Sequence, residues 1–194
     1  MSHRSSLHIA LSASALALIA GLAPAQAQAD TQPPMRPGFH SGSVITGFGP
    51  VATVEGREPL PANATFSVAF DVAEAAKPGA INRTLESAAR FINMHAEAGV
   101  PRDAVRVAVV VHGPASFDLT NAAAYARKHD GATNANLAAI AALIDNGVEI
   151  HLCGQSAAGQ GIARSDLAPG VRMQLSAMTA HALLQQQGYT LNPF

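Results

Sequence analysis

The strongest indication of the fold is a run of seven residues, Val105-Arg106-Val107-Ala108-Val109-Val110-Val111. All but one of these side chains are apolar, and most are β-branched, which is typical of a β-strand. A run that is apolar throughout, rather than alternating, indicates a strand buried on both faces. Such strands form the centre of a parallel sheet. His112-Gly113-Pro114 ends the run with residues that favour a sharp turn.

The sequence on both sides of this run alternates between strand and helix patterns. Further strands are predicted at residues 65–70, 148–152, 171–175 and 189–191. Helices are predicted at residues 81–98, 119–128, 136–146 and 177–187, with a short helical turn at 156–161. This alternation predicts an α/β fold with a parallel sheet covered by helices on both faces. Pro193 cannot donate a ladder hydrogen bond, so the last strand is expected at an edge.

The N-terminal part of the chain differs in composition from the rest. Residues 1–29 have a weakly basic start, an apolar run and an Ala-Gln repeat, which is the pattern of a secretory signal peptide cleaved after Ala29 or Ala27. An uncleaved membrane anchor is the alternative. Residues 30–63 are expected to form a flexible leader that contains a short edge strand or a hairpin within residues 44–54. The α/β domain is expected at 64–194.

Composition narrows the class of protein. A chain of 194 residues suggests one domain with a sizeable core. Charged residues make up 13% and the formal net charge is −1, so there is no basic excess to bind a nucleic-acid backbone. No segment after the signal peptide is apolar over a length that spans a bilayer. We therefore expect a soluble protein in the periplasm or outside the cell.

Four residues leave the carboxyl ends of four predicted strands, where open α/β sheets bind their ligands: Asp71, His112, Cys153 and Ser176. Cys153 is the single cysteine and cannot form an internal disulfide. Gly154-Gln155 follows it and opens a helical turn, whose N–H groups favour the thiolate. Cys153 and His112 are therefore the candidate catalytic pair, with Asp71, Gly154, Gln155 and Ser176 as candidate binding residues.

Other interpretations of these residues remain open. Cys153 is alternatively a buried structural thiol, and His112 a histidine that only bonds a loop. His151 points to the same sheet face as Cys153 and is expected to be a packing histidine. Cys153, His112 and His151 are metal ligands by type, but they lack a local spacing motif, so neither a metal nor another cofactor is predicted.

Several stretches together resemble the DsrE/DsrF-like family. They are residues 109–114, 151–162, 167–171, 176–180 and 187–189, in that order. The resemblance covers about residues 64–194. It implies a three-layer α/β/α sandwich whose five-stranded, mostly parallel sheet has the strand order 4-3-2-1-5. It also implies assembly into a homo-trimer or homo-hexamer, and sulfur-relay chemistry in which Cys153 holds a persulfide. Gln160 stands where relatives often have a basic residue.

Three functions follow from these observations. The first is a sulfur carrier or sulfurtransferase-like protein acting through Cys153, with donor and acceptor proteins or small sulfur compounds as partners. The second is a non-catalytic module that binds a small ligand or a protein at the same sheet rim. The third is a redox sensor that forms an intermolecular Cys153 disulfide.

Overall fold

The computed structural model describes residues 35–192, so the segment predicted as a signal peptide lies outside the described residues. One sheet contains five strands: β3 (Phe66–Val72), β4 (Val105–Val111), β5 (Glu149–Cys153), β6 (Arg172–Gln174) and β7 (Thr190–Asn192). Five α-helices accompany them: α1 (Arg83–Glu97), α2 (Ala122–Lys128), α3 (Asn136–Asp145), α4 (Gly154–Gln160) and α5 (Ala177–Gln186). Three short 3₁₀ helices complete the domain: η1 (Arg102–Ala104), η2 (Gly113–Leu119) and η3 (Arg164–Asp166).

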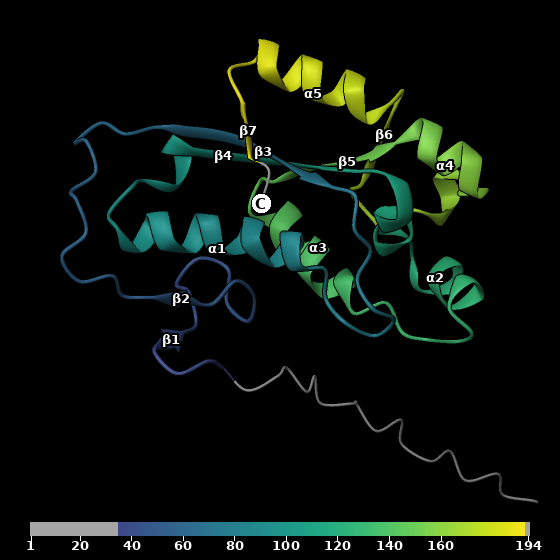
Figure 1. The fold of residues 1–194 in the computed structure, drawn as a ribbon, viewed down its shortest axis with the longest axis horizontal. Coiled ribbons are helices and arrows are strands. Elements are labelled where there is room, and N and C mark those ends of the chain that lie inside the picture. The colour runs from purple at the N-terminus through teal and green to yellow at the C-terminus, as the bar shows by residue number, and fades with distance from the viewer. Residues whose placement is uncertain (1–34, 193–194) are drawn as a thin grey trace, which may run out of the picture. The chain divides into compact units, whose positions relative to one another are not determined.

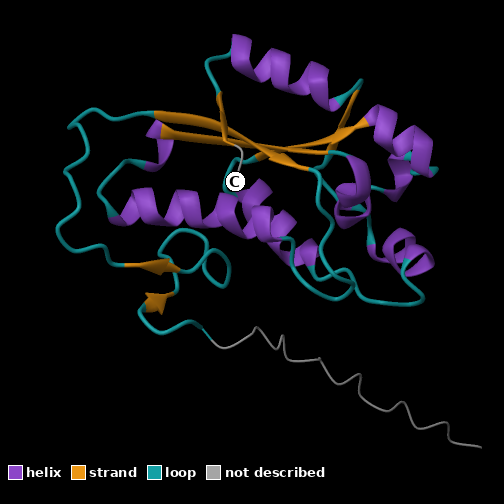
Figure 2. Cartoon of the chain, viewed as in Figure 1, coloured by secondary structure: helices purple, strands orange, loops and turns teal. Residues whose placement is uncertain are grey.

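The sheet has the order β6-β5-β4-β3-β7, and every neighbouring pair is parallel. Counted along the sheet's own strands this is 4-3-2-1-5, as predicted. Helices α1 and α3 lie on one side of the sheet and α5 lies on the other (Figures 1 and 2). The predicted α/β/α sandwich is therefore confirmed. None of the helices between residues 35 and 192 has the length and apolarity needed to cross a membrane.

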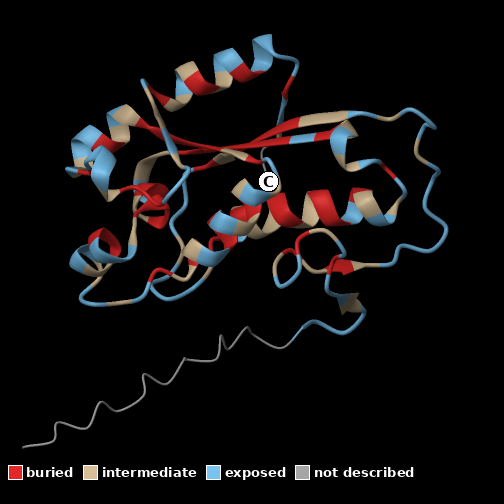
Figure 3. Cartoon of the chain, turned by 180° about the vertical axis from the view of Figure 1, so that it is seen from behind, coloured by how far each residue is buried: buried red, intermediate tan, exposed pale blue. Residues whose placement is uncertain are grey.

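The core is divided unequally by the sheet (Figure 3). Val107, Val109 and Val111 of β4 point into the larger cluster, together with residues of α1 and α3. Ala108 and Val110 point the other way, into a small cluster that includes Ala180 and Leu184 of α5. The sheet face under α5 therefore carries less apolar packing, and the polar residues described below share it.

Helix α1 begins two residues later than predicted, and two other helical segments differ from the prediction in their structure. The helix expected at 119–128 is split: η2 occupies Gly113–Leu119, and α2 begins at Ala122 after its N-cap Asn121, whose side chain accepts from the Ala124 N–H at 2.9 Å. Pro114 at the start of η2 and this Asx cap explain the break. The short turn expected at 156–161 begins earlier, because α4 follows Cys153 directly.

Residues 39–52 contain a short antiparallel pair, β1 (Phe39–His40) with β2 (Val51–Ala52). Between these strands, the chain wraps around the buried Asn93 of α1. The Asn93 side chain accepts from the Ile45 N–H at 2.8 Å and donates to the carbonyls of Ile45, Phe48 and Gly49. Residues 44–50 are therefore a loop held by one amide, while strand structure is confined to the flanking pairs.

A second buried polar group fixes the loop between β3 and α1. Asp118 in η2 is 2% exposed, and its Oδ2 accepts from the Ala76 N–H and from Asn82 Nδ2, both at 2.8 Å. Asn82 is the N-cap of α1. Burial of the Asp118 carboxylate raises its pKa, against the lowering effect of these hydrogen bonds. The Asp118 carboxylate therefore joins η2 to the loop before α1, and its burial costs desolvation free energy.

Candidate functional site

Cys153 is the last residue of β5 and the residue from which α4 starts. It lies on the sheet face that α5 covers, since Ile150 and Leu152 point to the larger core and side chains alternate along a strand. The residue is 6% exposed. The structure thus places the thiol at the carboxyl edge of the sheet, beneath the first turn of α5.

Polar groups close to Cys153 shift the pKa of its thiol. Burial acts to raise the pKa of the thiol, but the Ser156 hydroxyl and the backbone N–H groups of Ser156, Ala177 and Gln155 outweigh it. The Cys153 pKa therefore lies below its ordinary value, and the thiolate fraction at neutral pH is increased. Two of the three backbone donors belong to α4, and the third is the first residue of α5.

Ser156 is a site residue that the sequence analysis did not single out. Its Oγ accepts from the Gly113 N–H at 2.9 Å, so the hydroxyl hydrogen is free to point at the sulfur. Gln160 Nε2 donates to the Gly113 carbonyl at 2.8 Å, so both backbone polar groups of Gly113 bond side chains of α4. The Gly113-Pro114 turn after β4 thereby orients the Ser156 hydroxyl, which lowers the pKa of the Cys153 thiol at the end of β5.

Gly154 allows α4 to start close to the end of β6. A Cβ at this position would lie 2.4 Å from the Gln174 carbonyl oxygen and 3.2 Å from that of Leu175. Gln155, the next residue, donates from Nε2 to the Leu175 carbonyl at 3.3 Å. Gly154 and Gln155 thus keep the residues after Cys153 close to β6, and Gln155 acts on the thiol through its backbone N–H, because its side chain bonds Leu175.

Ser176, another predicted binding residue, is the N-cap of α5. Its Oγ accepts from the Thr179 N–H at 3.0 Å and pairs with Thr179 Oγ1 at 2.9 Å. The first N–H groups of a helix have no partner inside the helix. With Thr179 capped by Ser176, the Ala177 N–H is free to donate to Cys153.

Asp71, His112 and His181 form a cluster on the same face of the sheet. Asp71 Oδ1 accepts from His181 Nε2 at 2.7 Å, and Asp71 Oδ2 accepts from His112 Nε2 at 3.2 Å. Burial acts to raise the Asp71 pKa, but the bonds from His181 and His112 lower it below its ordinary range. His112, predicted as a partner of the thiol, has Asp71 as its hydrogen-bond partner here. His181 escapes sequence analysis because it lies within a helix, far from any strand end.

His151 is a buried histidine of β5. Its Nδ1 is 3.0 Å from Gln174 Nε2, so Nδ1 is the accepting nitrogen, and Nε2 lies 3.7 Å from Glu149 Oε2. Burial lowers the pKa of His151 and favours the neutral ring. The ring therefore fits the predicted packing role. Within residues 35–192, no three His, Cys, Asp or Glu side chains are arranged to hold a metal ion.

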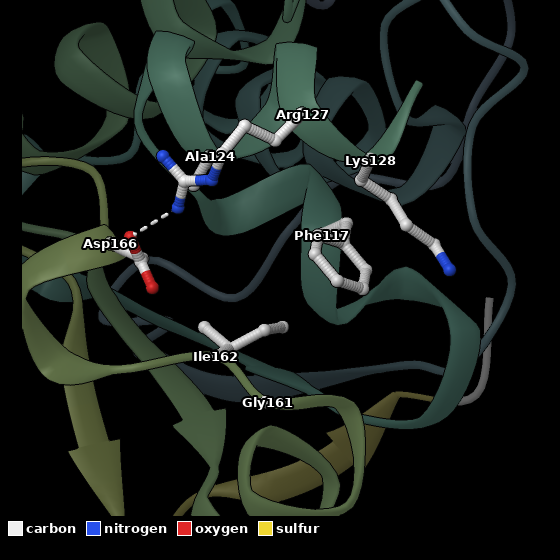
Figure 4. A pocket seen from close by; sticks show the side chains of 7 residues that line it. All are labelled: Phe117, Ala124, Arg127, Lys128, Gly161, Ile162 and Asp166. Atoms are coloured by element: carbon white, nitrogen blue, oxygen red, sulfur yellow. Dashed lines mark hydrogen bonds and ion pairs between the residues drawn. The ribbon is translucent and has the colours of Figure 1, made fainter. Parts of the chain in front are cut away.

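A separate cavity lies beside the other end of α4 (Figure 4). Its volume is about 210 Å³, and it is lined by η2, α2 and the segment that leaves α4. Arg127 Nη2 pairs with Asp166 Oδ1 across it at 2.8 Å, while Lys128 lies over the Phe117 ring at 5.1 Å. Both cations already have partners, and Cys153 does not line this cavity.

Comparison with known proteins identifies a family and a fold. The model of the DsrE/DsrF-like family matches residues 66–193. A solved structure of MTH1491, a protein of unknown function from Methanobacterium thermoautotrophicum, has a TM-score of 0.50 at 19% identity, with 66% of this chain and 99% of that chain covered. The ychN protein from E. coli has a TM-score of 0.49 at 14% identity, covering 67% and 100%. No curated protein matches the chain.

Proposed function

The chain belongs to the DsrE/DsrF-like family, and on that premise we propose that it is an exported sulfur carrier that holds a persulfide on Cys153. The family suggests a role related to sulfur relay. The observation that carries the finer proposal is the position of Cys153 at the start of α4, where the Ser156 hydroxyl and neighbouring N–H groups lower the pKa of its thiol. A thiolate is the form of cysteine that attacks sulfane sulfur, and these donors favour it.

The proposed step is a sulfane-sulfur exchange with no net redox change. The Cys153 thiolate attacks the outer sulfur of a donor hydropersulfide, RS–SH. A new S–S bond forms on Cys153 while the donor's S–S bond breaks, and the donor leaves as the thiolate RS⁻. The proton remains on the transferred sulfur until the persulfide ionises. An acceptor thiolate then attacks the outer sulfur and releases the Cys153 thiolate.

The first test is intact-mass analysis after incubation with polysulfide. Wild type is expected to gain the mass of one or more sulfur atoms, and dithiothreitol should remove the gain. Cys153→Ser serves as the matched control and should gain nothing, because the chain contains no other cysteine. Alkylation of the folded and the urea-unfolded protein, run in parallel, measures access to a residue that is 6% exposed.

A folded wild-type protein that gains no sulfur and resists alkylation would overturn the carrier proposal. The burial of Cys153 favours one alternative in that event, a module that binds a small ligand or a protein at the same sheet rim without covalent chemistry. Under that alternative, Cys153→Ser would retain binding. A dimer on a non-reducing gel would instead point to a redox sensor.

Export and assembly are part of the proposal. The N-terminal sequence pattern supports removal of residues 1–29, and the mass of the protein recovered from the periplasm tests it directly. Four exposed apolar side chains on or beside β6, α5 and β7 support a homo-oligomer: Leu175, Met178, Leu183 and Leu191. Light scattering coupled to size exclusion should then give a trimer or a hexamer, and a monomer would contradict the proposal.

A further inference from the structure

The donors around Cys153 are held in two different ways. Gln155 and Ser156 follow Cys153 within three residues, so their N–H groups are fixed to the thiol by the chain itself. The Ala177 N–H comes from the first residue of α5, three residues beyond Gln174, which pairs with Cys153 in the sheet. The direction of this N–H is set by how α5 lies on the sheet. Of the backbone donors, it therefore depends most on tertiary contacts.

The contact of α5 with the sheet is small. Ala180 and Leu184 enter a cluster of six buried residues, of which three are alanines. Among residues 35–192, one side chain of α5 makes a hydrogen bond to the sheet, from His181 Nε2 to Asp71 Oδ1 at 2.7 Å. At the other end of the helix, exposed Arg106 of β4 donates to the carbonyl of the C-cap Gln187 at 3.5 Å. His181 lies one helical turn beyond Ala177, so the two residues share a face of α5. His112 holds the other carboxylate oxygen of Asp71, which fixes its orientation.

We infer that His181 and Asp71 are positioning residues of the Cys153 site. Their hydrogen bond anchors α5 so that its first turn, with Ala177, stays beside Cys153. This inference rests on the proposed function for its biological meaning, because it describes how a carrier thiolate would be stabilised. The coupling itself, from Asp71 of β3 through α5 to the Cys153 thiol, does not require that the protein transfers sulfur.

The test is the pH titration of the Cys153 thiolate, followed by its ultraviolet absorbance, which needs no reagent to enter the site. In His181→Leu, loss of the anchor weakens one donor, and the thiol pKa should rise by about one unit. Asp71→Ala removes the same bond from the sheet side and should give the same shift. His181→Gln offers an amide N–H in place of Nε2 and should restore most of the wild-type pKa.

Leu143→Ala is the matched control for a general loss of stability. Leu143 is buried in the larger core on the opposite face, so its truncation should destabilise the domain without moving the thiol pKa. The inference is overturned if the folded His181→Leu and Asp71→Ala variants titrate as wild type does, or if Leu143→Ala shifts the pKa equally. If His181→Leu does not fold, Asp71→Ala carries the test, since Asp71 is partly exposed.

The two proposals fail separately. A pKa shift in the anchor variants together with no sulfur gain in wild type would remove the carrier function and keep the positioning role. Sulfur gain in wild type together with unchanged thiol pKa values in the anchor variants would keep the carrier function and remove the positioning role.

Discussion

Ser156 connects the turn after β4 to the thiol of β5 through one hydroxyl group. Replacing it by alanine removes a donor to the sulfur and leaves the Gly113 N–H without its acceptor. We expect Ser156→Ala to raise the Cys153 pKa by about one unit and to lower the free energy of unfolding by about 1 kcal/mol. A thiolate titration and urea unfolding measure the two effects.

Ser116→Ala is the control for this prediction. Ser116 is buried and donates to the Gly113 carbonyl at 2.7 Å, so the same turn loses a hydroxyl that does not bond the sulfur. This variant should lose stability but keep the wild-type thiol pKa. Equal pKa shifts in the two variants would show that the turn, and not the Ser156 hydroxyl, matters.

The residues of the site differ in how far the sequence predicts them. Asp71, His112 and Cys153 are found because each stands at the end of a predicted strand, and the carboxyl ends of parallel strands share an edge of the sheet. Ser156 and His181 are missed because their roles depend on tertiary geometry. Ser156 bonds the Gly113 N–H only because the fold brings η2 beside α4. His181 bonds Asp71 only because α5 packs over β3. Neither relation has a local sequence signal.

At the scale of elements, Gly154 sets how closely α4 approaches β6. Gly154→Ala would put a Cβ 2.4 Å from the Gln174 carbonyl oxygen, which is backbone and cannot rotate away. We expect the domain to lose about 1–3 kcal/mol of unfolding free energy. The same helix provides a matched control in Gly159, where a Cβ meets nothing within 4 Å.

Gly159→Ala should stabilise the domain by up to about 1 kcal/mol, because alanine favours the helix. Thermal unfolding of both variants checks the pair. A Gly154→Ala protein as stable as Gly159→Ala would contradict the close approach of α4 to β6.

Element types are predicted better than element ends. The strands and the long helix α1 follow from β-branched runs and from apolar spacing of three to four residues. The bounds of α4 are less well predicted. Gly154-Gln155 is expected to open a helical turn, but the turn itself is placed at 156–161, because Gly154 and Gly159 lower the helix propensity of a segment that packing against η2 and β5 stabilises. The split of the helix predicted at 119–128 depends on the cap at Asn121, a local interaction that competes with helix continuation.

At the scale of the whole molecule, Asp118 gives stability a dependence on pH. Its folded-state pKa is raised by burial, so the folded protein favours the protonated acid and the ionised form costs stability at neutral pH. Asp118→Asn keeps an oxygen acceptor for Ala76 and Asn82 without the charge. We expect its unfolding temperature to exceed that of wild type at pH 7.

The advantage of Asp118→Asn should shrink as the pH falls through the raised pKa, since wild type then becomes neutral at this position. Differential scanning calorimetry at neutral and acid pH measures it. An advantage that is constant with pH, or absent at pH 7, would contradict the cost assigned to the buried carboxylate.

The position of β7 has a consequence for how the chain reaches this structure. Thr190 pairs with Val68, although the two residues stand near opposite ends of the domain. As the chain emerges N-terminus first into the compartment where it folds, the apolar strand β3 can pair with β4 early, but its other edge has no partner until β7 has emerged. Contacts of such long sequence separation slow folding. An uncovered strand edge also promotes association between chains. We therefore expect β7 to protect the domain against aggregation by covering the free edge of β3.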